Sequence, residues 1–146
     1  MSLIDIEANT KGRERLIALV SRLTDEELGL QAGEGWSVAA ILAHLAFWDN
    51  RVLELIRRWK KAEVGRSPID VDNVNDAMKP LCVAVPARIA TSLAVSAAEA
   101  VDAELENLPE DLKPGIYALV QRGKFRLDRS FHRHEHLDQI DKILAK

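Results

Sequence analysis

The segment from Ser37 to about Ala62 constrains the fold most, because its pattern is that of a long amphipathic helix. It contains no proline and no glycine, and Ser37 is a favoured residue at a helix start. Spacings of three, four and seven place its apolar residues on one side of a helix. These residues are Val38, Ile41, Leu42, Leu45, Val52 and Ile56. A stripe of this length predicts a helix that is buried along one side.

Three other segments are also predicted to be long helices. Ile4–Leu23 carries apolar residues between charged ones, although Gly12 weakens its helical tendency. Ala87–Leu108 is rich in Ala, Leu and Glu, and its apolar residues recur at every fourth position. Arg126–Lys146 contains no proline or glycine. Four long amphipathic segments with few strand signals predict an all-α protein, a four-helix bundle.

The connections between these helices are long. Thr24 begins a capping box and a short helical turn before the loop Gly33–Gly35. Gly65–Asp76 is polar, and a short helix is predicted at Val71–Met78. Tyr117–Val120 fits either a short strand or an irregular segment. With connections of this length, a simple up-down-up-down order does not follow from the sequence.

Composition limits the class of protein. The chain has 146 residues, and we expect one domain spanning residues 1–146. Its net charge of −3, with both signs interspersed, predicts no binding of nucleic acid. No apolar run approaches the roughly 20 residues of a membrane span. Cys82 is the only cysteine and is expected to be buried rather than nucleophilic, and no signal peptide is recognisable. We therefore expect a reducing, cytoplasmic location.

Three of the four histidines lie within five residues of the last predicted helix. His132 and His136 are four residues apart, so they project from the same face. At about 100° per residue they lie on or beside the apolar side, whereas His134 faces solvent. The fourth histidine, His44, lies at the rim of the apolar stripe of the helix that Ser37 begins. Two imidazoles one turn apart are a common way for a helix to ligate one metal ion.

The residues alone leave two interpretations of these histidines open. If the two helices pack together, His44, His132 and His136 could ligate one cation, and Asp128 could orient the ring of His132. Alternatively, they are histidines at the edge of the core, hydrogen-bonded to carboxylates such as Asp128 or Asp49. Protonated imidazole cannot ligate a metal, so any metal binding is expected to weaken as the pH falls through about 6.5.

Five other residues are candidates for the surroundings of such a site. Arg129 and Arg133 lie on the apolar side of the last helix, where they could hold an anionic substrate. Ion pairs with acids of neighbouring helices or of a partner subunit are the preferred interpretation. Trp48, one turn after His44, could form a pocket wall, although plain core packing is favoured. Asn73 and Asn75 could reach a pocket from the long connection, although a role in a turn or cap is favoured.

Two motifs together resemble the DinB/YfiT-like metalloenzyme superfamily. The first is Gly35-Trp36-Ser37 leading into the run Ile41–Asp49. The second is the run His132–Ile140, in which a histidine pair four residues apart is followed by Leu and by Gln-Ile. The order and the wide separation of the two motifs match the family, and the resemblance covers nearly the whole chain.

This resemblance implies a DinB-like four-helix bundle in which His44, His132 and His136 bind a divalent metal, commonly zinc or nickel. His134 is an addition to the family pattern. Known members include thiol-dependent S-transferases and maleylpyruvate isomerases. The resemblance therefore implies a metal-dependent enzyme of the S-transferase or isomerase type that acts on a small-molecule substrate, with a low-molecular-weight thiol as a candidate cofactor. Hydrolysis also fits the chemistry of such a metal site. Family habit, together with Trp59 and the arginines, also favours a homodimer.

Two other functions remain open. The chain could be a non-catalytic bundle that binds a metal or a small molecule. It could also be a structural or interaction protein that has lost metal binding. Nothing in the sequence identifies the thiol, the substrate or a catalytic residue.

Overall fold

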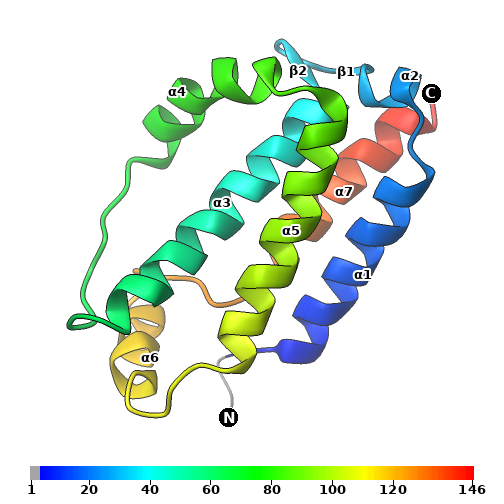
Figure 1. Ribbon diagram of the computed structural model, residues 1–146. Coiled ribbons are helices and arrows are strands. Elements are labelled where there is room, and N and C mark those ends of the chain that lie inside the picture. The colour runs from blue at the N-terminus through cyan, green and yellow to red at the C-terminus, as the bar shows by residue number, and fades with distance from the viewer. Residues whose placement is uncertain (1–3) are drawn as a thin grey trace.

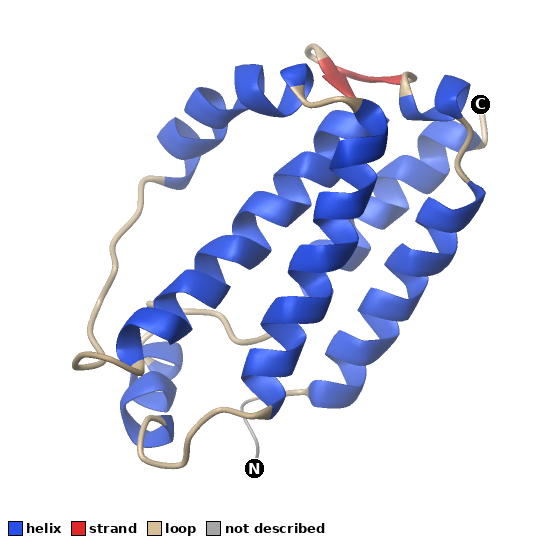
Figure 2. Cartoon of the chain, viewed as in Figure 1, coloured by secondary structure: helices blue, strands red, loops and turns tan. Residues whose placement is uncertain are grey.

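The structure, a computed structural model, describes residues 4–146. Within that range it is a bundle of long helices, which confirms the predicted all-α class (Figures 1 and 2). The long helices are α1 (Ile6–Arg22), α3 (Val38–Trp59), α5 (Ala87–Glu106) and α7 (Ser130–Leu144). The connections contain α2 (Asp25–Leu28), β1 (Gln31–Gly33), β2 (Trp36–Ser37), α4 (Val71–Ala84) and α6 (Lys113–Gln121).

The bundle has an up-down-down-up order. Helices α1 and α7 run in one direction, and α3 and α5 run in the other (Figure 1). Within the pairs, α1 contacts α7 and α3 contacts α5. Between the pairs, α1 contacts α5 and α3 contacts α7. Helix α4 makes this order possible, because it carries the chain from the end of α3 back to the start of α5. Strands β1 and β2 form a small antiparallel hairpin that leads into α3.

Side chains recognisable in the sequence begin several helices. The hydroxyl of Ser37 accepts a hydrogen bond from the backbone N–H of Ala40 (3.1 Å), which caps α3. Thr24 and Glu27 form the predicted capping box of α2. The carboxylate of Asp70 caps α4. These caps satisfy N–H groups that have no partner within the helix.

Helix α7 begins at Ser130 rather than at Arg126, because the residues before it are held in another way. Phe125 and Leu127 alternate with exposed residues and are buried in the core in a non-helical conformation. Asp128 then accepts hydrogen bonds from the backbone N–H groups of Ser130 and Phe131. Burial of two apolar side chains thus outweighs the helical tendency of this segment.

Two connecting segments are more helical than expected. Tyr117–Val120 lies inside α6, where Ile116 and Leu119 face the core, so neither a strand nor an irregular segment forms there. The helix predicted at Val71–Met78 continues to Ala84 and includes Pro80. Pro80 has no N–H to donate within the helix, and its side chain is exposed. Burial of Met78 and Cys82 on either side of it stabilises the helix.

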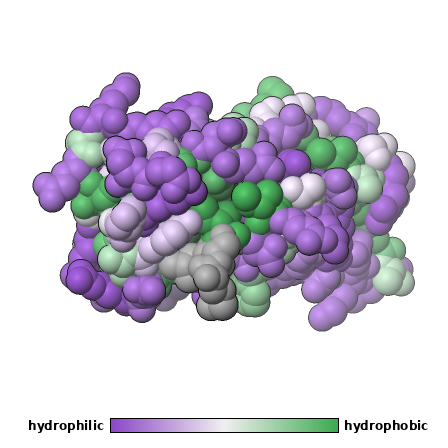
Figure 3. Space-filling model, turned by 90° about the horizontal axis from the view of Figure 1, so that it is seen from below, coloured by the Kyte–Doolittle hydropathy of each residue, from purple (hydrophilic) through white to green (hydrophobic). Residues whose placement is uncertain are grey.

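The hydrophobic core has two parts. One lies toward the hairpin and contains Leu16, Leu42 and Leu137. The other lies toward α6 and contains Ile56 and Leu105. Viewed from the α6 end, the surface is mostly hydrophilic, with hydrophobic side chains gathered near its middle (Figure 3).

A layer of buried charge separates the two parts, and Arg133 of α7 is its centre. Arg133 is only 1% exposed. Its two terminal nitrogens donate to both carboxylate oxygens of Asp102 in α5, at 2.9 and 2.8 Å. They also donate to the carboxylate of Asp49 in α3 (3.2 Å) and to the backbone carbonyl of Asn9 in α1 (3.0 Å). One side chain therefore joins α7 to each of the other three long helices.

Further bonds complete this charge layer. The Nε of Arg129 donates to Asp49 (2.9 Å), and Arg13 donates to Asp102 (2.6 Å). The predicted ion pairs of Arg129 and Arg133 with acids of neighbouring helices therefore form within the chain itself. Burial acts to lower the pKa of Arg133, but the hydrogen bonds and charges of the two aspartates outweigh it and raise that pKa.

Trp59 was one reason to expect a homodimer, and the structure removes that reason. Trp59 is 4% exposed and packs edge-on against Phe125, with 5.1 Å between ring centroids. Because Arg129 and Arg133 are also buried, the expected homodimer now rests on family resemblance alone.

No helix in residues 4–146 combines the length and the hydropathy that crossing a membrane requires.

Loss of the central arginine should destabilise the fold strongly. We expect Arg133→Met to lower the free energy of unfolding by about 3 kcal/mol or more, because two buried carboxylates lose their shared partner. Denaturant unfolding of the purified protein measures this. The control is Arg57→Met, which removes an exposed ion pair with Glu54 and should cost no more than about 1 kcal/mol. Equal losses in the two variants would contradict a central role for the layer.

Candidate metal centre

His44 occupies a buried position two turns into α3. It is 8% exposed, and the ring of Trp36 meets it edge-on at 5.6 Å between centroids. Its Nδ1 atom is buried and has no hydrogen-bond partner among the described residues. An unpaired buried polar atom costs on the order of 1–3 kcal/mol. The protein therefore holds this ring where a ligand for its nitrogen would be stabilising.

His132 and His136 of α7 face His44, as the spacing predicted. The ring centroids of the α7 pair lie 4.7 Å apart. His44 lies 5.3 Å from His132 and 4.8 Å from His136, measured in the same way. Both α7 rings are half-buried. Two helices that are distant in the sequence thus bring these three imidazoles together.

The three histidines fit the requirements of a divalent metal ion. One nitrogen from each ring can be chosen so that all three lie within 4.8 Å of one another. Zinc–nitrogen bonds of about 2.0 Å place tetrahedral ligands about 3.3 Å apart, so small side-chain rotations would close the remaining distance. With the unpaired nitrogen of His44, the donor set is one that could hold a metal ion.

Gln139 holds the ring of His136. Its Oε1 lies 3.0 Å from Nδ1 of His136, one turn further along α7. A carbonyl oxygen accepts the proton of Nδ1, which leaves the lone pair of Nε2 free. Support of this kind fixes the tautomer and the orientation of metal-binding histidines.

Burial keeps two of the three imidazoles uncharged. It lowers the pKa of His44 to about 4, with a further contribution from the neighbouring His136. It lowers the pKa of His132 to about 3, with further contributions from His136, Arg129, His44 and Arg126. Since only neutral imidazole can ligate a cation, both rings are ready to do so at neutral pH.

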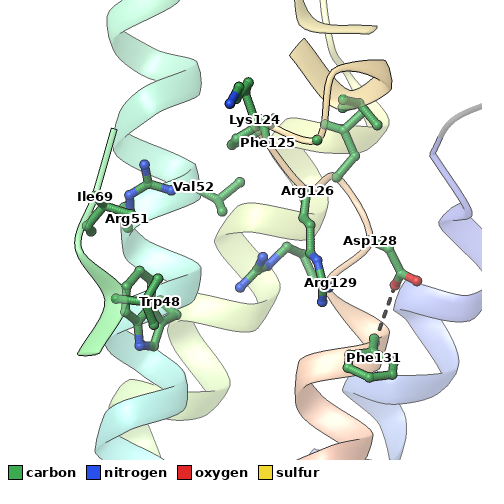
Figure 4. Close-up of a pocket in the computed structure, with 14 residues that line it drawn as sticks. Trp48, Arg51, Val52, Ile69, Lys124, Phe125, Arg126, Asp128, Arg129 and Phe131 are labelled. Carbon is green, nitrogen blue, oxygen red and sulfur yellow. Dashed lines mark hydrogen bonds between the residues drawn. The ribbon is translucent and has the colours of Figure 1, made fainter. Parts of the chain in front are cut away.

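Two of the three histidines border a pocket of about 220 Å³. His44, His136 and Gln139 line one part of it, and other lining residues are Trp36, Ile41, Asn75 and Asp76. Trp48 donates from its indole nitrogen to the side-chain oxygen of Asn75 (3.0 Å). Trp48 also lines a second, larger pocket of about 660 Å³ (Figure 4). The Trp48–Asn75 pair therefore stands between the two pockets.

The structure decides several of the alternatives that the sequence left open. Trp48 and Asn75 do line pockets, whereas Asn73 is exposed and donates its backbone N–H to the cap of α4. Asp128 is an exposed acid at the start of α7, and Asp49 pairs with arginines, so neither accepts a hydrogen bond from the three histidines.

His134 and Cys82 lie away from the three histidines. His134 is half-buried rather than solvated, and its Nδ1 lies 2.8 Å from the guanidinium of Arg15. Cys82 is buried, as expected, and burial raises the pKa of its thiol. A thiol with a raised pKa is a poor nucleophile, so Cys82 does not compete with the histidine site.

Trp36 and Gln139 were not assigned a role from the sequence, although both lie in the two motifs. Gln139 could have been found from its spacing, because a residue three after His136 lies on the same helix face. Trp36 precedes α3, and only the hairpin places it beside His44. Its position therefore depends on the folded connection.

Comparison with known proteins agrees with the geometry. A family model described as the DinB superfamily matches residues 8–140. No significant match was found among curated proteins or among solved structures. The matched range covers most of the chain and includes all three histidines of the site. The chain therefore belongs to the DinB superfamily.

Proposed function

We propose that this protein is a metal-dependent enzyme in which His44, His132 and His136 hold one divalent cation, zinc or nickel. The reaction proposed is S-transfer or isomerisation of a small molecule, with a low-molecular-weight thiol as co-reactant. The observation that carries the proposal is the convergence of three imidazoles from α3 and α7 beside a pocket.

A divalent ion with three protein ligands keeps an open position, where it lowers the pKa of a bound thiol or water and polarises a carbonyl. The chain's own residues would prepare this chemistry. Gln139 fixes the tautomer of His136. Trp36 packs edge-on against the ring of His44. Asn75 and Asp76 supply polar groups in the pocket next to the histidines.

Two features of the site favour a metal over purely structural histidines. Structural histidines at a core edge usually hydrogen-bond to a carboxylate or a carbonyl group. Here Nδ1 of His44 has no such partner among the described residues, and the nearby Asp49 is already paired with Arg129 and Arg133. Burial also lowers the pKa values of His44 and His132, so that both present lone pairs at neutral pH.

Each of the three histidines should be necessary for metal binding. We expect protein produced without a histidine tag to bind one zinc or nickel ion per chain. Changing His44, His132 or His136 to Ala should abolish stoichiometric binding, because two imidazoles hold these ions weakly against water. Calorimetric titration of metal-free protein measures the stoichiometry and the affinity.

The matched control for this titration is His134→Ala, which removes a histidine of the same helix that points away from the site. It should leave binding nearly unchanged. Gln139→Ala is an intermediate case, and we expect it to weaken binding by about tenfold or more. Loss of metal in His134→Ala, with retention in His132→Ala, would contradict the proposed ligands.

The metal-free protein should show the lowered pKa values directly. Nuclear magnetic resonance titration of the imidazole nitrogens should give midpoints well below 6.5 for His44 and His132, near 4 and 3. Between about pH 6.5 and these values the unfolded chain binds more protons than the folded chain. The free energy of unfolding should therefore fall as the pH falls through this window.

His44→Gln is the control for that pH dependence, because glutamine does not titrate. The variant should lose part of the decrease in stability below pH 6.5. Midpoints near 6.5 for both rings in the wild-type protein would show that burial does not keep them neutral.

Catalysis requires a separate test, because a binding bundle would also take up the metal. We expect metal-loaded protein to accelerate conjugation of an electrophile with at least one thiol from a panel that includes cysteine and glutathione. The His132→Ala variant should lack this rate enhancement. Metal binding without acceleration by any thiol of the panel would favour the alternative of a non-catalytic binding protein.

A further inference from the structure

The larger pocket is lined by Trp48 and by none of the three histidines. Its volume is about 660 Å³, within the range of about 300–1,000 Å³ that is usual for small-molecule sites. Helix α3 forms one wall, and the segment between α6 and α7 forms the opposite wall (Figure 4). Trp48 follows His44 by one turn, and Arg129 precedes His132 by three residues. The pocket therefore adjoins the histidine site but does not contain it.

The charge that lines this pocket is predominantly positive. Arg51, Lys124, Arg126 and Arg129 line it, and Asp128 is the acidic residue of its lining. Asp128 already accepts hydrogen bonds at the start of α7. Arg129 is paired with Asp49, which it shares with Arg133. The pocket thus contains cationic side chains in excess of the anionic groups available to them.

Three of these cations have no carboxylate partner within residues 4–146: Arg51, Lys124 and Arg126. Arg51 donates one nitrogen to the backbone carbonyl of Ser67 (2.8 Å), which anchors its guanidinium on the α3 side. Burial lowers the pKa of Arg51, and the positive charge of Arg129 lowers it further. Arg51 is half-buried next to the positive charge of Arg129, and a cation in such a place is stabilised by an anion.

The rest of the lining is apolar. Val52 and Phe125 belong to the core at its base, whereas Ile69 and Phe131 are exposed at its sides. Phe131 is 59% exposed, and the guanidinium of Arg126 lies 5.3 Å from its ring centroid. An occupant that is complementary to both parts of the lining has an anionic head and an apolar body.

We infer that this pocket binds small carboxylates with an aromatic or aliphatic body, the carboxylate being held by Arg51 and Arg126. A guanidinium donates two parallel hydrogen bonds to a carboxylate, which gives both affinity and orientation. The apolar body lies against Phe125, Phe131 and the indole of Trp48. The inference goes beyond the proposed metal chemistry and does not depend on it, because none of the three histidines lines this pocket.

A pair of matched probes tests this in the metal-free protein. We expect 4-phenylbutyrate to bind in isothermal titration calorimetry, and the neutral 4-phenylbutyramide, of the same shape, to bind at least about tenfold more weakly. The affinity for the carboxylate should also fall as sodium chloride is added. Absence of 4-phenylbutyrate binding, or equal affinity for the two probes, would overturn the inference.

Substitutions then locate the site. Arg51→Gln and Arg126→Gln should each weaken 4-phenylbutyrate binding by about tenfold or more, because each removes charge-assisted hydrogen bonds. Arg58→Gln, which changes an exposed arginine two turns further along α3, is the control and should bind like the wild type. Arg126 is exposed, so its substitution tests the site even if Arg51→Gln fails to fold. Unchanged binding in Arg126→Gln would assign the carboxylate to another place.

Since these titrations use metal-free protein, their result does not depend on whether the three histidines bind a metal ion. Binding of 4-phenylbutyrate with no metal uptake would support the carboxylate pocket and refute the metal site. Metal uptake with no discrimination between the two probes would do the reverse.

Discussion

The buried charge layer around Arg133 is the interaction on which the arrangement of the four long helices depends. Apolar contacts alone allow helices to slide and to rotate, because many packings bury similar areas. Arg133 removes this freedom, since its donors must reach Asp102, Asp49 and the carbonyl of Asn9 together. Any shift of α7 by part of a turn would leave charges unpaired in a region with little water, at a cost of several kcal/mol.

The same constraint positions the histidine site. His132 is the immediate neighbour of Arg133 in α7, and His136 lies three residues beyond it. The anchoring of Arg133 therefore fixes the rotation of α7 about its axis, and with it the direction in which both histidines project. On the α3 side, Asp49 receives Arg133 and Arg129, and it follows His44 by five residues. The charge layer thus sets the relative register of the two helices that carry the three imidazoles.

The layer also sets the electrostatics on either side of it. Three arginines face two aspartates there, which leaves an excess of positive charge. The charge of Arg129 contributes to the lowered pKa of His132 and also to that of Arg51. In both cases burial is the larger cause, and the charge of Arg129 adds to it. The neutral imidazole of His132 is able to ligate a metal ion, and an anion in the adjoining pocket would stabilise the charge of Arg51. The proposed metal site and the proposed carboxylate pocket are therefore compatible with each other.

The sequence by itself determined the long helices and the common face of His132 and His136, because both follow from local periodicity. No knowledge of the partner helices is needed to recognise the apolar stripe of α3, the caps at Ser37 and Thr24, or the spacing of the two histidines. Only the tertiary structure decided what those faces meet. It made Arg133 the centre of an ion-pair layer, gave Gln139 and Trp36 their places beside the rings, and buried Phe125 and Leu127 so that α7 begins later than its composition predicts. These outcomes depend on contacts between residues far apart in the chain, and local propensities carry no information about which of several compatible packings satisfies the buried charges.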